Sequence, residues 1–344
     1  MSTELTPFAQ ITPPSSPHAG PADVRTTGGA DPSLGRLTAV ADWFARRRDD
    51  TGVLVRPRVV VVAGDHGSAT GDDRSDRDLA VGELLAAAHG AGWHRIDVAS
   101  HGADIADDDV ISAGHPDAVV ADVLAHDDAI AAVELGRRLA DREIDAGADL
   151  LIPGLTGSGH GLPLGVLTAV LTGLEPIAAV TVPDTDPTAW VAAVTDLRDT
   201  LFRLRDRHKD VVSLIAAVGG ADLGVLAGLI AQAAVRRTPV LLDGLPATIA
   251  AVLAHRLAPG ADAWFIGAGQ AVDRPGRRLQ DMLGLPLVAD LATDSPGAAG
   301  AVLVLPLIQA ALAVAVDHTT TFVADETEVL GPVSLAKVSR SPGG

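Results

Sequence analysis

The run Val59-Val60-Val61-Val62-Ala63, closed by Gly64, constrains the fold of this chain more than any other stretch. β-Branched residues favour strands over helices. An apolar run without polar alternation is typical of a strand buried on both faces of a parallel sheet. The sequence therefore has to supply further strands beside this one and helices that cover the sheet.

In the rest of the chain, predicted strands alternate with predicted helices. Further strands are predicted at residues 96–99, 150–153, 238–242, 264–266 and 287–291. Helices are predicted at residues 78–90, 118–139 (as one helix or two), 164–174, 223–235, 249–257, 277–283 and 299–316. The stretch 211–218 suits either a buried strand or a helix. Such alternation predicts an α/β fold, with helices flanking a mainly parallel, Rossmann-like sheet.

Composition limits the partners of the protein. The net charge of −18 would repel nucleic acids and anionic membranes, so we expect neither as a partner. Aromatic residues make up 3% and tyrosine is absent, which disfavours a base-stacking surface. The sequence has no cysteine, which excludes disulfides and cysteine-based metal or redox sites. Of the classes of partner considered, a small-molecule ligand is the one that the composition leaves open.

The two ends of the chain differ from its middle. Residues 1–32 are rich in turn-forming residues and lack periodicity, so they are expected to form a flexible arm, and residues 331–344 a loose tail. The start of the chain is acidic and rich in proline, unlike a secretory leader, and its apolar runs are interrupted short of the roughly 20 residues of a membrane helix. We therefore expect a cytoplasmic protein.

Four loops are expected at the carboxyl ends of strands, where ligands bind in open parallel sheets. They are residues 64–67 with Asp65 and His66, the glycine-rich loop 154–161, the pair Gly219-Gly220, and Asp243-Gly244. A glycine-rich loop between a strand and a helix commonly holds phosphate on backbone N–H groups. The loop 154–161, with Gly154, Gly157, Ser158, Gly159 and His160, contains no Lys, Arg or carboxylate.

Several residues admit two interpretations from the sequence alone. Asp65 either faces a substrate or caps neighbouring N–H groups, and Asp243 is either a helix N-cap or a ligand contact. The histidines lack the paired spacing of a metal motif, so no metal and no cofactor are predicted. The apolar helices at 223–235 and 299–316 are either fully buried, which we favour, or part of a dimer interface.

These loops, taken in order, resemble the nicotinate-nucleotide:dimethylbenzimidazole phosphoribosyltransferase family over about residues 57–330. The resemblance is carried by "VVVVAGDHGSA", "GADLLIPGLTGSG", "VGGADLGVLAGLIAQAAVRRTPVLLDGLPATIAAVLAHRLAP", "GAAGAVLVLPLIQAAL" and "TTTF". Each motif alone is a weak indication of the family, but the order and spacing of all of them together are specific to it.

The resemblance implies a fold, an assembly and a reaction. It implies a large α/β domain at 57–304, a smaller helical domain from residues 33–56 and about 305–330, and a homodimer. The implied reaction moves phosphoribose from nicotinate mononucleotide to a benzimidazole-type base in assembly of the cobalamin nucleotide loop. Its chemistry needs a carboxylate to accept the proton of the base and groups that hold the 5′-phosphate. The partners would be a nucleotide and an aromatic base.

The chain departs from the family pattern at the reactive positions. The position of the family's general-base Glu falls on Gly297, a second acidic position falls on Leu155, and a phosphate-binding Lys falls near Ala193. Asp294 and Asp290 are the candidate substitute bases. Asp294 is preferred, although it also suits a helix N-cap. His160 could donate to phosphate when charged.

Three functional hypotheses follow. The first is an active, divergent phosphoribosyltransferase. The second is a catalytically impaired paralogue that binds a nucleotide or base and regulates, or forms a heterodimer with, an active homologue. The third is another α/β enzyme, such as a nucleosidase. The substrate-binding candidates common to these hypotheses are Asp65, His66, Gly154, Gly157, Ser158, Gly159, His160, Gly219, Gly220 and Asp243.

Overall fold

The computed structural model describes residues 4–15, 35–48, 52–67, 73–101, 109–180, 187–205, 210–293 and 297–323; side chains of 73–78 and 316–323 are not included. Its centre is a parallel sheet of β1 (Pro57–Gly64), β2 (Gly92–Ala99), β3 (Leu150–Thr156), β4 (Val240–Leu242) and β5 (Phe265–Gly267). The strand order is β2-β1-β3-β4-β5. The direction of winding therefore reverses between β1 and β3, which is where such sheets place ligands.

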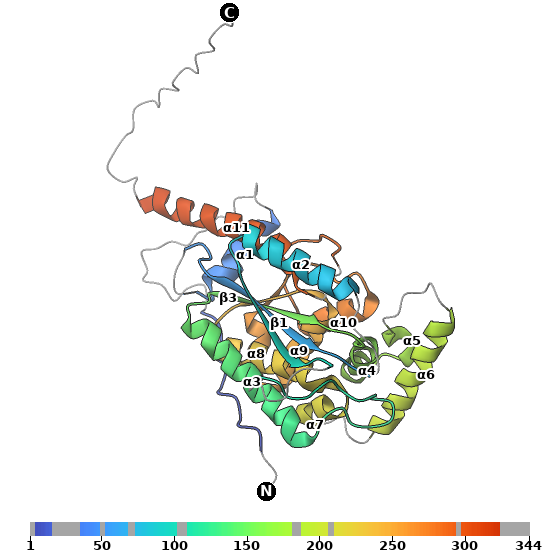
Figure 1. Cartoon of the computed structure of the whole chain (residues 1–344). Helices are drawn as coiled ribbons and strands as arrows, with labels where there is room; N and C mark the ends of the chain where they lie inside the picture. The colour runs from blue at the N-terminus through green and yellow to red at the C-terminus, as the bar shows by residue number, and fades with distance from the viewer. Residues whose placement is uncertain are drawn as a thin grey trace, which may run out of the picture.

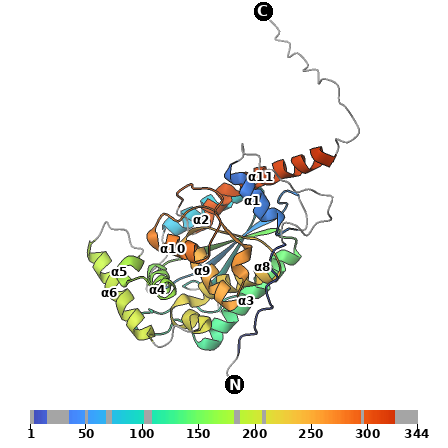
Figure 2. The same ribbon diagram turned by 180° about the vertical axis from the view of Figure 1, so that it is seen from behind.

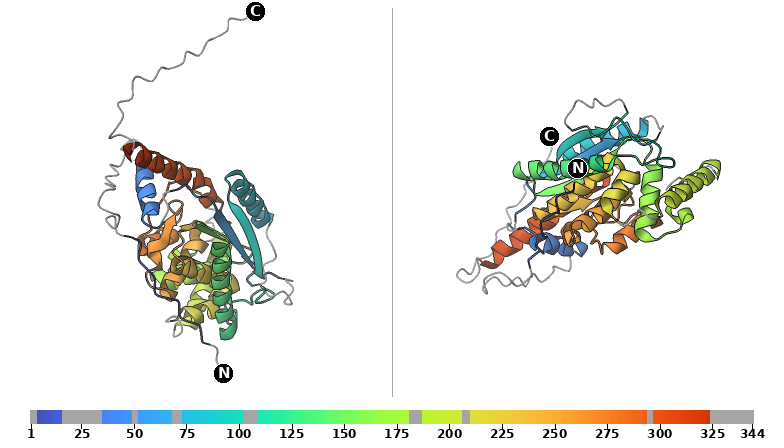
Figure 3. Two further views of the ribbon diagram at one scale, coloured as in Figure 1. Left: turned by 90° about the vertical axis from the view of Figure 1, so that its left-hand side faces the viewer. Right: turned by 90° about the horizontal axis from the view of Figure 1, so that it is seen from below.

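Helices cover both faces of the sheet (Figure 1). They are α1 (Arg36–Ala45), α2 (Asp73–Ala88), α3 (His126–Asp145), α4 (Gly161–Thr172), α5 (Pro176–Ala179), α6 (Pro187–Leu204), α7 (Val211–Leu214), α8 (Gly220–Val235), α9 (Gly244–Leu257), α10 (Arg274–Met282) and α11 (Ala299–Val323). One face carries α1, α2 and α11, and the other carries α3, α8 and α9, as the side view in Figure 3 also shows. This arrangement confirms the predicted α/β class.

Alternate residues of β1 enter separate cores, as the pleat of a strand requires. Val60 and Val62 pack with α3 and α8, while Val59 and Val61 pack with α1 and α11. All four side chains are fully buried. The valine run is therefore apolar throughout because β1 is a central strand with helices on both faces.

One stretch that suited either a strand or a helix is helical, and one predicted strand is wrong. Residues 211–218 are helical: α7 continues through a π-helical turn, Ile215–Gly219, into α8. Residues 287–291 do not form a strand, although Val288 and Ala289 donate backbone hydrogen bonds to Gly267 and Ala268 beyond β5. Residues 211–218 are mostly buried, whereas within 287–291 only Val288 is buried and Leu291 is 45% exposed. An apolar run alone therefore does not select between a strand, a helix and a loop.

The first and last described helices lie side by side. α1 packs against α11, and Val40 and Phe44 of α1 share one core with Val302 and Leu305 of α11 and with sheet residues (Figure 2). The division into a large domain and a smaller helical domain stays a prediction. The expected tail, 331–344, lies outside the described residues, as do residues 16–32 of the expected arm.

Residues 4–15, within the expected flexible arm, run across the body of the protein. Ile11 is buried, and the indole N–H of Trp264 donates to the backbone oxygen of Thr12 at 3.1 Å. Arg137 on α3 lies over the Phe8 ring, 4.0 Å from its centroid, and donates to the backbone oxygen of Thr6 at 2.7 Å. This part of the arm is held by side chains whose partners are remote in the sequence.

The stretch Val211–Val235 is long and apolar enough to cross a membrane by length and composition. In this fold its most apolar 18-residue window is entirely buried, with α8 lying between the sheet and neighbouring helices. This confirms burial for the predicted helix 223–235. Its apolar character is that of a core helix.

Candidate functional site

The loops that follow β1 and β3 meet where the winding direction of the sheet reverses, and hydrogen bonds to Asp65 link them. The Asp65 carboxylate accepts hydrogen bonds from the Ser158 N–H and hydroxyl, both at 2.8 Å, and from the His101 N–H at 2.9 Å. Burial would raise the pKa of Asp65, but the donors on His101 and Ser158 lower it. Of its two interpretations, this geometry matches the capping of N–H groups, with donors supplied by other loops.

The two loops approach so closely that glycine is required at their contact. Gly159 has a φ of +77°, and a Cβ there would lie 2.0 Å from the backbone oxygen of His66. Gly157 is similarly placed against the Gly64 oxygen. The His66 N–H donates to the Ser158 oxygen at 2.9 Å and the Gly67 N–H to the His115 oxygen at 3.1 Å. The amides of His66, Gly67 and Ser158 thus bind loop atoms, and of these only Ser158 belongs to the loop 154–161 in which a phosphate cradle is predicted.

A buried carboxylate, Asp222, lies beneath these loops at the start of α8. His66 Nε2 is 3.1 Å from both Asp222 oxygens, and His160 Nε2 is 2.8 Å from Oδ2. The Asp222 side chain is fully buried and that of His160 is 13% exposed. Burial alone would raise the pKa of Asp222, but the facing His66 and His160 hold it well below its usual range.

A third imidazole, His115, completes this cluster. Its ring stacks on His66 with centroids 4.3 Å apart. His115 Nδ1 donates to the backbone oxygen of Asp65 at 2.9 Å, and its Nε2 accepts from the Ala221 N–H at 2.8 Å. Burial lowers the pKa of His115 to about 4, so the ring is neutral near pH 7. His66 Nδ1 is buried without a hydrogen-bond partner among the described residues.

The sequence did not single out Asp222, and it mentioned His115 only among the histidines without a metal motif. The available signal was that Asp222 is the only charged residue between Asp210 and Arg236. A lone charge inside an apolar segment is expensive to bury unless it is paired. The predicted pair Gly219-Gly220 also differs in context, since it lies where the π-helical turn meets α8 and not after a strand.

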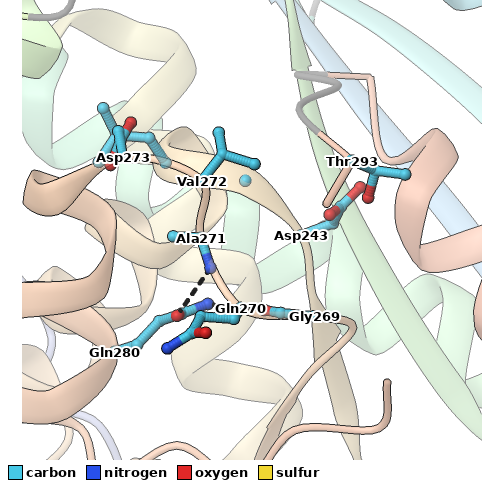
Figure 4. Close-up of a pocket in the computed structure, with 10 residues that line it drawn as sticks. Asp243, Gly269, Gln270, Ala271, Val272, Asp273, Gln280 and Thr293 are labelled. Atoms are coloured by element: carbon cyan, nitrogen blue, oxygen red, sulfur yellow. Dashed lines mark hydrogen bonds between the residues drawn. The ribbon is translucent and has the colours of Figure 1, made fainter. Parts of the chain in front are cut away.

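A second group of candidate residues lies at the ends of β4 and β5. Asp243 follows β4, is buried, and accepts a hydrogen bond from the Ala301 N–H of α11 at 3.0 Å. It lines a small pocket with Thr293 and residues 269–273, which face each other across the pocket in Figure 4. Gln280 shapes the pocket by accepting from the Ala271 N–H at 3.0 Å. None of the β1 and β3 loop residues described above lines this pocket.

The remaining candidates are placed as follows. Gly154 lies within β3, not in the loop, and a Cβ there would be 3.2 Å from that of Ala298. Its role is to let the segment before α11 pack on the sheet. Gly297, at the family's Glu position, is buried and has no side chain, while Asp294 lies outside the described residues. Leu155 is buried in β3, and Ala193 lies on α6.

The comparisons with known proteins agree with this architecture. A family model described as "Phosphoribosyltransferase" matches residues 22–325. A nicotinate-nucleotide–dimethylbenzimidazole phosphoribosyltransferase of Mycobacterium avium (strain 104) is 38% identical over 338 residues, covering 92% of this chain and 96% of the relative. The protein of that name from Mycobacterium tuberculosis (strain ATCC 25618 / H37Rv) is 37% identical over 337 residues, covering 92% and 93%.

The fold is also shared with a solved structure. The crystal structure of the Thermus thermophilus phosphoribosyltransferase of the same name matches with a TM-score of 0.73 and 28% identity, covering 81% of this chain and 89% of that one. Sequence and fold thus agree over most of the chain and confirm the resemblance. This chain belongs to the nicotinate-nucleotide–dimethylbenzimidazole phosphoribosyltransferase family.

Proposed function

We propose that this protein transfers phosphoribose from nicotinate mononucleotide to a benzimidazole-type base in assembly of the cobalamin nucleotide loop. The products are nicotinate and an α-ribazole phosphate. The observation that carries this function is relatedness along the whole chain, 38% identity over 92% of it, to a protein named for that reaction. Such coverage favours transfer over the catalytically impaired paralogue.

The reaction requires a group that takes the proton of the attacking base. As one nitrogen of the benzimidazole attacks C1′, the bond from C1′ to nicotinate breaks and the proton on the other nitrogen must leave. Gly297 cannot accept it. Asp294 precedes this position by three residues and is the proposed base. Asp243 is another carboxylate of this region, but it already accepts the Ala301 N–H.

The substrate-binding group is proposed to come from the loops after β1 and β3. Because Asp65 is occupied by Ser158 and His101, its role is to hold the two loops together. His160 is the loop side chain that remains partly exposed while it pairs with a buried carboxylate. It is proposed to donate to the phosphate in place of the family's lysine. Lys209 and Lys337, the only lysines, lie outside the described residues.

The decisive experiment incubates purified protein with nicotinate mononucleotide and dimethylbenzimidazole and follows nicotinate and α-ribazole phosphate by chromatography. We expect turnover in the wild type and a fall of about 10²- to 10⁴-fold in kcat for Asp294→Asn, the range for a lost general base. Asp290→Asn, four residues earlier, tests the other candidate base and should retain activity if Asp294 is the base. Absence of turnover in the wild type, with nucleotide binding retained, would favour the impaired paralogue.

Assembly and location belong to the same proposal. We propose a cytoplasmic protein that acts as a homodimer, or as a heterodimer with an active homologue. Val81 and Leu84 of α2 are 51% and 70% exposed, and Leu303 of α11 is 39% exposed, on helices that pack together. Apolar residues exposed on neighbouring helices are typical of an association surface. Light scattering of the purified chain measures the oligomeric state.

A further inference from the structure

The side chains around Asp222 converge on one point from separate elements. The ligating atoms of His66, His115 and Asp222 all lie within 4.8 Å of one another, and all three residues are buried. A Cβ added to Gly220 would lie 2.6 Å from His66 Cε1, 2.9 Å from Asp222 Oδ1 and 2.9 Å from His115 Nε2. Only a glycine at position 220 therefore leaves these groups free to face one another. His160 approaches the same carboxylate from the loop after β3.

The distances suit a small cation as well as hydrogen bonds. In a tetrahedral site with bonds of about 2.0–2.1 Å to nitrogen and oxygen, neighbouring ligand atoms lie roughly 3.3 Å apart. The two imidazole contacts to Asp222 are 3.1 Å and 2.8 Å. Expansion by a few tenths of an ångström would admit an ion, with the Nε2 protons of His66 and His160 moving to Nδ1 of each ring.

The electrostatics also favour a cation at this point. Among the described residues, no Arg or Lys side chain bonds to Asp222; its charged-group partners are His66 and His160. A fully buried carboxylate needs a compensating charge. In the Nε2–H tautomer of His66, Nδ1 is buried without a partner among the described residues. In the Nδ1–H tautomer, a second mismatch is added, because an unprotonated Nε2 faces the carboxylate oxygens. A metal ion between Nε2 and Asp222 would relieve the second mismatch.

We propose that His66, His160 and Asp222 form a binding site for a divalent transition metal of the zinc type, with the His115 ring, whose nitrogens bind Asp65 and Ala221, stacked on His66 as support. Imidazole nitrogen with carboxylate oxygen suits Zn²⁺, Co²⁺ and Fe²⁺ better than Mg²⁺ or Ca²⁺. His160 is less buried than His66 and Asp222, with 13% of its side chain exposed, so a water or a ligand oxygen on its side would be the remaining donor. The site would place positive charge at the β1/β3 switch point, where a phosphate or carboxylate ligand would meet it.

The test is metal binding by the full-length protein after removal of bound metal with a chelator. After Zn²⁺ is added back and the unbound metal is removed by dialysis, we expect elemental analysis to find about one equivalent of Zn²⁺ per chain. Titration with Co²⁺ should give the visible absorption of a site with fewer than six ligands. His160→Gln and His66→Gln should each weaken Co²⁺ binding more than tenfold, since each removes a donor.

His94→Gln is the matched control, because His94 also pairs with a carboxylate, Glu143, but near the start of β2, at the other end of the sheet from this cluster's loops. Its metal binding should equal that of the wild type. His160 is partly exposed, so His160→Gln carries the test even if substitution of Asp222 prevents folding. No bound metal in the wild type, or equal affinity in His160→Gln, His66→Gln and wild type, would overturn the proposal.

The metal site rests on side-chain geometry, so its test is separate from that of phosphoribosyl transfer. A protein that transfers phosphoribose without binding metal would contradict only the metal site. A protein that binds metal at His160 but produces no α-ribazole phosphate would contradict only the proposed reaction.

Discussion

Gly159 shows how a single residue controls the approach of the two loops. Replacement by Ala would place a Cβ 2.0 Å from the His66 oxygen at a φ of +77°. Gly173 has a similar φ of +71° but nothing within 4 Å of its added Cβ. We expect Gly173→Ala to lower the free energy of unfolding by about 1 kcal/mol, and Gly159→Ala by about 2–4 kcal/mol because a steric clash is added. Urea denaturation measures both, and equal losses would contradict the close contact.

Asp65 provides a second test at the same scale. Asp65→Asn replaces one of the accepting oxygens by an amide NH2 group, a donor that would face the donors of Ser158 or His101. We expect a loss of about 1–3 kcal/mol in unfolding free energy, the range for buried polar groups left without partners. Asp117→Asn, at an exposed Asp that accepts one N–H from Val119, is the control and should lose less than about 1 kcal/mol. A smaller loss for Asp65→Asn than for the control would show that the hydrogen bonds of Asp65 do not hold the two loops together.

At the scale of single residues, the sequence predicted which loop residues lie together better than it predicted their hydrogen-bond partners. The loop residues Asp65, His66, Ser158 and His160 were chosen correctly as neighbours, because parallel strands bring their carboxyl ends to one edge. Asp222 was missed because its helical segment reads as uniformly apolar, and a hydrogen-bond partner more than 60 residues away leaves no local pattern, as for His160 at a separation of 62.

Among the elements, α3 is tied to the sheet by a buried carboxylate. Glu143 of α3 accepts from His94 of β2 at 2.9 Å and from Arg58 of β1 at 2.7 Å. The hydrogen bond from His94, with a further contribution from Arg58, lowers the pKa of Glu143 from 4.5 to about 2. Since the folded-state pKa is the lower one, the stabilisation is complete above pH 4.5 and is lost as the pH falls towards 2.

The consequence is a stability difference that depends on pH. Glu143→Gln should lower the free energy of unfolding by about 1–2 kcal/mol at pH 7, a value reduced for solvent screening, and by progressively less below pH 4.5. Urea denaturation at pH 7, 5 and 3 measures the difference. Glu134→Gln on the same helix, in a more exposed pair with Arg137, should show a small difference at each pH. A Glu143→Gln difference that stays constant with pH would exclude the linkage.

The elements with strong patterns were predicted from the sequence, and those defined by partners were not. β1 was evident because four consecutive valines suit only a buried strand. Residues 287–291 are also largely apolar, interrupted by Asp290, yet beyond β5 they make only a single bridge, at Leu287. Whether an apolar run becomes a strand depends on a neighbour that supplies the backbone hydrogen bonds, and no single stretch of sequence encodes that neighbour.

The arrangement of the whole molecule explains why the site had to be found in space. The order β2-β1-β3-β4-β5 brings residues 65, 115, 160 and 222 to one switch point, although they belong to four separate segments. The family resemblance supplied the order of these segments, and the structure supplied the distances. Metal-motif spacing could not predict the cluster, because each donor comes from a different element.

The start of the chain contributes to the stability of the whole fold. Ile11 is 8% exposed and lies against Gly260, next to the Thr12 oxygen that binds the Trp264 indole. Ile11→Ala removes buried apolar area, so we expect a loss of about 2 kcal/mol in unfolding free energy and faster proteolytic cleavage of the arm. Thr12→Ala, whose exposed hydroxyl has one 3.4 Å contact to Arg237, should change neither quantity appreciably. If Ile11→Ala matched Thr12→Ala in both measurements, residues 4–15 would have to move independently of the body, as the composition of the first 32 residues alone had indicated.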